Sequence, residues 1–201
     1  TMVQVFREVR RVLHPSGTCW LNLGDSYYNY RPGYEAQSKQ TIAKHNGAVV
    51  EESAKRGTRI DGLKEKDLCL IPWRVALALQ ADGWWVRSVI VWHKKSCMPE
   101  SVTDRPTNSW EPIFLLAKSA RYFYDADAVR EEPATDNPVR VISPKQIAAG
   151  RMSLNRTTYE TNPSGRNQRN VWSLGPEPYS EAHFATFPTE IPRRASLAGT
   201  S

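Results

Sequence analysis

The segment VWHKKSCMPESVTDRPTNSWEPIFLLAKS, residues 91–119, joins two apolar runs through a long polar connection with prolines at positions 99, 106 and 112. A hairpin connection needs only about two to five residues. A longer connection is usually functional or disordered, and each proline fixes one backbone dihedral angle, which argues against disorder. We therefore interpret the connection as a stiff loop that handles a nucleic acid strand.

Five side chains of this loop and its flanks suit contact with a nucleic acid. Lys94, Lys95 and Arg105 can pair with phosphates, and Asn108 and Glu111 can read base edges. The alternative is that the lysines only solvate the end of a strand.

Three further side chains of the segment have two interpretations each. Trp92 and Trp110 could stack on bases, but Trp92 lies inside an apolar run and we favour a core position for it. A catalytic thiol at Cys97 is the less favoured interpretation of that residue.

The elements that must position this loop follow from apolar periodicity. The i, i+3, i+4, i+7 spacing predicts a helix over residues 2–13, and TCWLNL at 18–23 predicts a buried strand. A second helix is predicted from residue 70, with Pro72 in its first turn and Gly83 after its end. Strands follow at 84–92 and 109–119, and two strands joined without a helix are usually antiparallel. The expected fold is α/β, with a mostly parallel sheet that ends in an antiparallel hairpin.

The remaining segments are more polar. Residues 29–66 have no sustained periodicity and are predicted to be a loop or mobile insert, and RYFYDADAVREE, residues 121–132, is predicted to be a short strand and turn leading into a helix. Residues 133–170, rich in Pro, Ser, Asn and Arg, are interpreted as a linker or a basic insert. Residues 171–201 again contain apolar residues between turn signals, and PTEIPRR predicts a helix start with Thr189 as its cap.

Asp25 directly follows the first predicted strand. In open α/β sheets ligands bind outside the carboxyl ends of strands, so Asp25, Ser26 and Tyr27 lie where a binding site is expected. A plain Asp-Ser turn is the alternative, and the residues alone leave both open.

Composition bounds the class of protein. The chain has 201 residues, a net charge of +6 and no apolar run near the length of a membrane span. Its three cysteines lack CxxC or disulfide-framework spacing, which favours a reducing compartment, and its four histidines lack metal-ligand spacing. No P-loop, HExxH, GxSxG or GxGxxG motif occurs. The basic balance favours a phosphate-bearing partner.

Three segments, in this order, resemble the bacterial and phage DNA amino-methyltransferases: FREVRRVLHPSGTCWLNLGDSY; DLCLIPWRVALALQADGWWVRSVIVWHKKSCMPESVTDRPTNSWEPIFLLAKSARYFYDADAVRE; and HFATFPTEIPRRASLAG. The pattern MPESVxDRPTxxxE followed by FLLAKS is the most specific part. The resemblance implies a Rossmann-like S-adenosylmethionine-dependent methyltransferase fold, present here incompletely. It also implies methylation of adenine N6 or cytosine N4 in double-stranded DNA after base flipping.

The same resemblance assigns parts of the chain to roles. Residues 1–132 would be the central part of the catalytic domain, 133–170 the target-recognition region, and 171–201 a return to the catalytic domain on the cofactor side. A restriction endonuclease would be a possible partner, and the cytoplasm of a bacterium, or of a phage-infected one, the expected location.

Site residues are carried over in two groups. The cofactor-side candidates are Asp25, Phe187, Pro188 and Thr189. The candidates for contact with DNA are Lys94, Lys95, Pro99, Arg105, Asn108, Glu111, Arg151, Arg156, Arg166 and Arg169.

The chain departs from the family in two places. Neither the catalytic PPY or PPW tetrapeptide nor the FxGxG cofactor motif occurs in it, so no catalytic residue is assigned and the chain is interpreted as an incomplete enzyme, inactive alone. Three alternatives remain open: a DNA-binding module without catalysis, a methyltransferase acting on RNA or protein, and a generic α/β protein.

Overall fold

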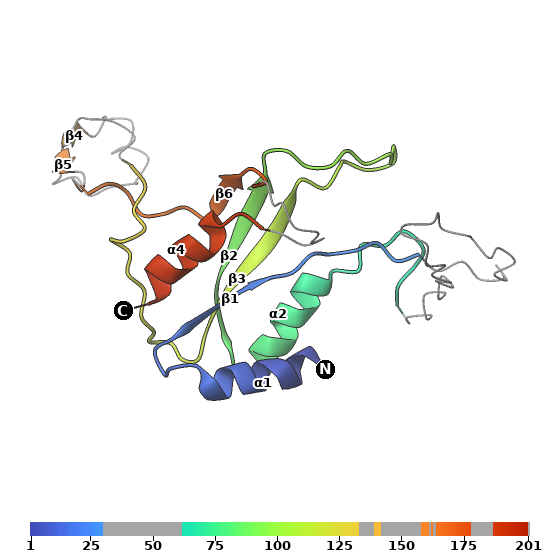
Figure 1. Ribbon diagram of the computed structural model, residues 1–201, viewed down its shortest axis with the longest axis horizontal. Coiled ribbons are helices and arrows are strands. Elements are labelled where there is room, and N and C mark those ends of the chain that lie inside the picture. Colours follow the sequence, from blue (N-terminus) through green and yellow to red (C-terminus); the bar gives the residue numbers. More distant parts are fainter. Residues whose placement is uncertain are drawn as a thin grey trace, which may run out of the picture.

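The computed structural model describes residues 1–29, 62–132, 139–141, 158–160, 162, 164–177 and 187–200. In this part of the chain a four-stranded sheet carries helices on both faces (Figure 1). A separate two-stranded sheet pairs β4 (Val139–Val141) with β5 (Thr158–Glu160).

The main sheet has the order β1-β3-β2-β6. Its strands are β1 (Thr18–Asn22), β2 (Trp85–Lys94), β3 (Trp110–Ala117) and β6 (Val171–Leu174). β3 is antiparallel to both β1 and β2, while β2 and β6 are parallel. The predicted antiparallel pairing of β2 with β3 is therefore confirmed.

The prediction of a mostly parallel sheet needs correction in the described part of the chain. The hairpin does not close the sheet at its edge, because β3 inserts between β1 and β2 and makes two of the three pairings antiparallel. β1, β2 and β6 still run in one direction. The apolar runs predicted the strands, but strand order depends on pairings between residues far apart in the sequence.

Helices lie on the two faces of this sheet. α1 (Met2–Val12) and α2 (Ile71–Ala81) cover one face, and α4 (Glu190–Gly199) covers the other (Figure 1). The alternation of side chains along β3 produces two cores: Phe114 and Leu116 belong to the core beneath α1 and α2, whereas Ile113 and Leu115 belong to the core beneath α4.

Aromatic contacts anchor both cores. Phe114 is fully buried and meets Trp73 of α2 edge to face, with ring centroids 5.3 Å apart. On the α4 side, Trp20 of β1 stacks on the buried Trp172 of β6 at 5.9 Å. Because β1 and β6 are the two outer strands, this stack spans the sheet beneath α4.

The first two helices lie where periodicity predicts them. α1 begins at a capping box formed by Thr1 and Gln4, which the sequence analysis missed. α2 contains Pro72 in its first turn, and Gly83 follows its end with φ of +95°, a conformation that favours glycine. None of the helices in the described ranges combines the length and apolarity needed to cross a bilayer.

Two of the three cysteines lie in or against the core. Cys69 is buried, and Cys19 is half-buried against the core beneath α1 and α2. Burial raises the pKa of the Cys19 thiol, so this group stays protonated like a small apolar side chain.

The prediction of a strand and a helix start at 121–132 is wrong. This segment forms turns, because one carboxylate oxygen of Asp125 accepts hydrogen bonds from the backbone N–H groups of Asp127 and Ala128, at 3.0 and 2.9 Å. Such a local bond offers the backbone an alternative to a helix.

The prediction at the start of α4 is half right. The helix begins after Thr189, as predicted, but the threonine hydroxyl does not cap it. Instead, the hydroxyl and backbone N–H of Thr189 each donate to the Glu177 carboxylate at 3.0 Å. The predicted insert at 29–66 lies mainly outside the described residues.

Replacing Phe114 with Ala should lower the free energy of unfolding by about 3–5 kcal/mol, because it removes a fully buried ring at the centre of the sheet. Urea denaturation of the variant and the parent chain measures the change. The control is Leu77→Ala on α2, whose side chain is 65% exposed and should change the value by about 0.5 kcal/mol or less. Equal losses for the two variants would contradict the central position of β3.

Glu190, the first residue of α4, should make stability depend on pH. Its carboxylate bonds to Arg193 at 2.5 Å and to Arg194 at 2.8 Å. The hydrogen bond from Arg193, acting against burial and assisted by Arg194, lowers the pKa of Glu190 from 4.5 to about 2. A carboxyl group with a depressed folded-state pKa stabilises the fold above its unfolded pKa and loses that contribution as pH falls through the folded value.

The stability difference between the parent chain and Glu190→Gln should therefore be largest above pH 4.5 and shrink as the pH approaches about 2. Denaturation midpoints measured across this range test it. A difference that stays constant with pH would show that the ion pairs at Glu190 add no stability.

Candidate functional site

Several strand ends meet at one edge of the sheet. β1 ends at Asn22, β2 at Lys94 and β6 at Leu174, and β3, running the other way, begins there at Trp110. The carboxyl edge of same-direction strands is where open α/β sheets bind ligands. The loop 95–109 joins β2 to β3 at this edge, so the structure puts the segment singled out from the sequence there.

A polar bridge crosses this edge. The Glu111 carboxylate of β3 forms an ion pair with Lys94 Nζ at 2.5 Å and accepts a hydrogen bond from Asn22 Nδ2 at 3.2 Å. Lys94 Nζ also lies 4.9 Å from the centroid of the Trp92 ring. Two residues predicted to contact DNA therefore contact each other, and the sequence analysis missed Asn22 as a partner of Glu111.

A cavity of about 380 Å³, here named the loop cavity, lies between the loop 95–109 and the chain that follows β6. Of the predicted residues, Lys94, Asn108 and Pro188 line it, and Cys97 and Glu177 line it as well. Its volume is within the range of small-molecule sites, about 300–1,000 Å³. The structure thus brings together one cation, one amide and one cofactor-side proline from three parts of the sequence.

Trp92 forms part of the wall of the loop cavity. It is 6% exposed, which confirms the predicted core position. Its indole N–H is buried and has no hydrogen-bond partner, a condition it shares, within the described residues, with Trp84. Buried donors without a partner are uncommon in folded proteins.

Arg105 braces the loop from within. Its Nη1 lies 2.5 Å from the Glu100 carboxylate and donates to the carbonyl of Pro106 at 3.1 Å. Its guanidinium carbon lies 3.9 Å from the centroid of the Tyr27 ring, which follows β1. The sequence predicted Tyr27 to lie at the strand end but not its contact with Arg105, because the two residues are far apart in the sequence.

A second ion pair joins the same loop to Lys66, which follows residue 61 in the sequence. Lys66 Nζ lies 2.7 Å from the Asp104 carboxylate, and this hydrogen bond lowers the pKa of Asp104. Tyr27 and Leu68 form an isolated antiparallel bridge. The loop 95–109 therefore contacts Tyr27, which precedes residue 30 in the sequence, and Lys66, which follows residue 61.

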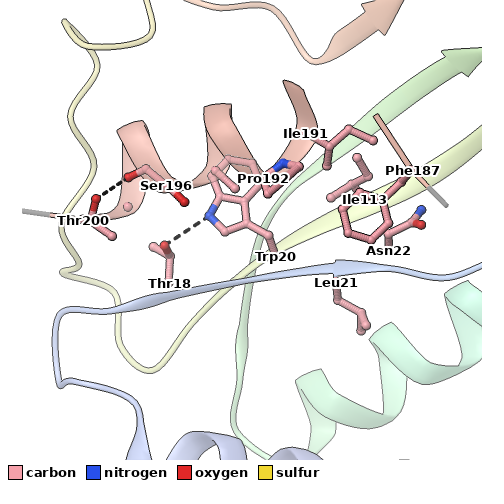
Figure 2. A pocket seen from close by; sticks show the side chains of 12 residues that line it. Thr18, Trp20, Leu21, Asn22, Ile113, Phe187, Ile191, Pro192, Ser196 and Thr200 are labelled. Carbon is pink, nitrogen blue, oxygen red and sulfur yellow. Dashed lines mark hydrogen bonds between the residues drawn. The ribbon is translucent and has the colours of Figure 1, made fainter. Parts of the chain in front are cut away.

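A second cavity, of about 490 Å³ and here named the helix cavity, lies between β1 and α4 (Figure 2). Trp20 and Asn22 from β1 and Ile113 from β3 line one side, while Phe187 and Ile191 line the other (Figure 2). Phe187 is 52% exposed, so much of its ring remains accessible.

The four cofactor-side candidates do not line a single cavity. Phe187 lines the helix cavity and Pro188 the loop cavity, so adjacent residues border different spaces. Thr189 is held by Glu177. Asp25 lines neither cavity: one oxygen of its carboxylate accepts from the backbone N–H groups of Ser26 at 2.9 Å and Ile71 at 3.0 Å, which fixes the start of α2.

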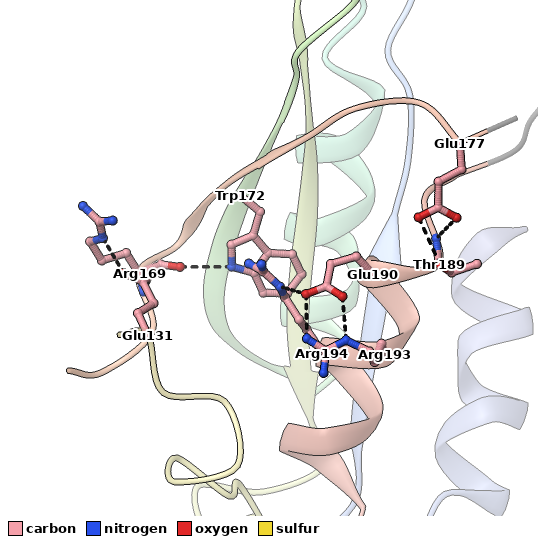
Figure 3. Close-up of polar contacts among 8 residues, drawn as sticks. All are labelled: Glu131, Arg169, Trp172, Glu177, Thr189, Glu190, Arg193 and Arg194. Carbon is pink, nitrogen blue, oxygen red and sulfur yellow. Dashed lines mark hydrogen bonds and ion pairs between the residues drawn. The ribbon is translucent and has the colours of Figure 1, made fainter. Parts of the chain in front are cut away.

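The predicted recognition arginines divide into two pairs. Arg151 and Arg156 lie outside the described residues. Arg166 and Arg169 each donate from Nε to the Glu131 carboxylate at 2.9 Å, and Figure 3 shows Arg169 beside Glu131. No signal in the sequence identified Glu131 as the partner of both arginines.

The other predicted residues of the loop have open surroundings. Lys95 and Pro99 are exposed, and the neighbouring Met98 is 84% exposed, so the loop is not packed into the interior. Lys95 is the one predicted loop cation for which the described residues provide no carboxylate partner. Among those residues, no group of three or more His, Cys, Asp or Glu side chains could hold a metal ion.

Comparison with known proteins identifies the family. A family model described as DNA methylase, covering N6 and N4 enzymes, matches residues 1–200. The chain is 43% identical over 199 residues to the type II methyltransferase M.Cfr9I of Citrobacter freundii, a match that covers 99% of this chain and 55% of that protein. It is 41% identical over 199 residues to the type II methyltransferase M.SmaI of Serratia marcescens, covering 99% of this chain and 57% of the relative.

These matches confirm the resemblance seen in the sequence. The chain spans a little over half the length of these curated relatives, while almost all of its own residues are matched. Over nearly its whole length, the chain belongs to the N6/N4 DNA methylase family.

Proposed function

We propose that the protein carrying this chain is a site-specific DNA methyltransferase. It would transfer a methyl group from S-adenosylmethionine to the exocyclic amino group of adenine (N6) or cytosine (N4). The observation that carries the proposal is the loop cavity, because the family's most specific sequence pattern forms its wall at the carboxyl ends of β2 and β6. The mixed sheet would be part of a Rossmann-like methyltransferase fold.

The loop cavity would receive the target base. An exocyclic amino group cannot be reached inside a duplex, so the base must leave the stack and enter a pocket. The Asn108 amide can hydrogen-bond a base edge, and the cavity adjoins the buried Trp92. The bonds that Arg105 makes to Glu100 and Tyr27 hold the loop in shape before the base arrives, which reduces the entropy lost on binding.

Contacts with the DNA backbone would come from cations that internal carboxylates do not occupy. Lys95 is exposed and follows the end of β2, so it is the strongest of the loop candidates. Lys94 and Arg105 stay candidates for phosphate contact, but their ion pairs support a second role in shaping the loop. Pro99 and Glu111 would act on the shape of the cavity edge rather than on phosphate.

The cofactor would be held on the α4 side of the sheet. S-adenosylmethionine supplies a methyl group bonded to a positively charged sulfur. The accessible ring of Phe187, the Trp20 ring and the Asn22 amide give the helix cavity a mostly apolar wall with few polar groups, which suits a small organic molecule. Pro188 and the bonded pair Thr189–Glu177 would fix the chain between the two cavities. Asp25 would act indirectly, through the start of α2.

The division of the chain follows the same proposal. Residues 1–132 and 171–201 would belong to the catalytic domain, and 133–170, with Arg151 and Arg156, would recognise the target sequence. The relatives are type II methyltransferases, which supports a restriction-modification setting for a bacterial or phage-encoded protein in the cytoplasm, with a restriction endonuclease as a partner.

The direct test is methyl transfer by the complete protein that carries this chain. The protein is incubated with unmethylated duplex DNA and radiolabelled S-adenosylmethionine, and the DNA is digested to nucleosides. Label should appear in N6-methyladenine or N4-methylcytosine. Leu77→Ala, far from both cavities, is the matched control and should retain the activity. Label in RNA or protein alone, or DNA binding without transfer, would refute the proposal.

The two roles open to Arg105 predict different results for a conservative change. A phosphate contact needs only positive charge, so Arg105→Lys would keep most of the affinity for DNA. A brace needs the planar guanidinium that stacks on Tyr27 and bonds Glu100, which lysine cannot supply. We expect Arg105→Lys and Arg105→Ala to weaken duplex binding by similar factors, measured by fluorescence anisotropy.

Lys95→Ala provides the contrasting variant. Loss of one phosphate contact should weaken binding to all sequences alike and reduce the slope of log affinity against log salt by about 1. Near-normal binding by Arg105→Lys, together with a reduced salt slope for Arg105→Ala, would instead establish Arg105 as a phosphate contact.

A further inference from the structure

Residues 131 and 166, which are far apart in the sequence, pair with each other beside the main sheet. Glu131 and Arg166 form an isolated antiparallel bridge. The N–H of Glu131 donates to the carbonyl of Arg166 at 3.0 Å, and the N–H of Arg166 donates to the carbonyl of Glu131 at 2.9 Å. The two ends of the intervening segment are therefore fixed to each other by the backbone.

The Glu131 side chain reinforces this bridge. One carboxylate oxygen accepts from Nε of Arg166 and Nε of Arg169, and the other accepts from the backbone N–H of Arg169, each at 2.9 Å. The carboxylate is 21% exposed. Burial alone would raise the pKa of Glu131, but the hydrogen bonds from Arg169 and Arg166 outweigh it and lower the pKa. The group therefore stays ionised and bonded at neutral pH.

Two neighbours fit this arrangement closely. Gly165 has φ of +104°, and a Cβ at this position would overlap the carbonyl oxygen of Glu131, so only glycine suits both the conformation and the contact. Arg130 donates from Nη1 to the Gly165 carbonyl at 3.3 Å and to the Asn167 side chain at 3.1 Å. We name Glu131, Arg166 and Arg169 the stem clamp.

The stem clamp leads directly into the wall of the loop cavity. The carbonyl of Arg169 accepts from the indole N–H of Trp172 at 3.0 Å, and Trp172 is 2% exposed (Figure 3). Trp172 lies in β6, which runs parallel to β2 and ends at Leu174, a residue that lines the loop cavity. A short run of ordered chain thus joins the clamp to the cavity.

We propose that Glu131 is a positioning residue for DNA sequence recognition. By clamping Arg166 and Arg169, it fixes residue 131 and residues 166–169 relative to β6 and the loop cavity, so that sequence contacts made by the chain between residues 132 and 165 would keep a fixed register with the base in the loop cavity. This inference rests on the proposed function. It gives Arg166 and Arg169 a carboxylate rather than a phosphate as their main partner.

A first experiment measures the stability of the stem clamp in the absence of DNA. Hydrogen exchange is measured at the amides of Arg166 and Arg169, both of which donate to Glu131, in the parent chain, Glu131→Ala and Glu131→Gln. Exchange at these amides should rise about tenfold or more in Glu131→Ala and less in Glu131→Gln, because glutamine keeps an acceptor but loses the charge. Unchanged exchange in both variants would overturn the clamp.

The control removes a carboxylate of the same kind elsewhere. Glu8 on α1 pairs with Arg11 at 2.7 Å, and both side chains are more than 60% exposed. Glu8→Ala should leave exchange at Arg166 and Arg169 unchanged. A matching rise in this control would attribute the effect to general destabilisation and overturn the proposal.

A second experiment measures the sequence specificity of DNA binding. The complete protein selects from duplexes with randomised central positions, and affinity for unselected bulk duplex is measured alongside. In Glu131→Ala and Glu131→Gln the consensus should weaken or disappear while bulk affinity stays within about threefold, a combination that simple unfolding would not produce. A consensus as strong as in the parent would overturn the inference and leave the proposed function intact. If the parent itself selects no consensus, the proposed function fails, and recognition through the clamp fails with it.

Discussion

The double pairing of β3 is the constraint on which the rest of the structure depends. Because β3 lies between β1 and β2, its alternating side chains fill both cores, with Phe114 on one face and Ile113 on the other. Its first residues also lie at the carboxyl ends of the neighbouring strands. Glu111 can therefore bond Lys94 of β2 and Asn22 of β1 at once. The pairing that forms the core also sets the edge beside which the loop cavity lies.

Two isolated bridges join residues that are far apart in the sequence. Tyr27 pairs with Leu68, and Glu131 pairs with Arg166. Each bridge fixes two separate parts of the described chain to each other. The first bridge also holds the loop 95–109, through the stack of Arg105 on Tyr27, so the cavity wall is supported from outside the hairpin that contains it.

Local patterns in the sequence predicted the elements better than their partners. Periodicity located α1, α2, β2 and β3 to within a few residues, and an apolar run predicted the burial of Trp92. Periodicity could not predict that β1 pairs with β3, because paired residues such as Thr18 and Ala117 are far apart in the sequence. Glu131 was missed for the same reason: its arginine partners lie 35 and 38 residues away. The resemblance to a family suggested candidate site residues, but only the structure showed which of the described cations form ion pairs.

This distinction changes how the basic character of the chain is understood. A net charge of +6 would attract DNA, the proposed substrate, at long range whichever cations carry it. At short range the cations differ, since Lys94, Arg105 and Arg166 each bond an internal carboxylate, whereas Lys95 remains open to solvent. A paired arginine costs the binding step less entropy, because it is already ordered, but contributes less new charge to a phosphate. Under the proposed function, the paired cations would therefore act mainly on the shape of the binding surface, and cations such as Lys95 would supply most of its attraction for DNA.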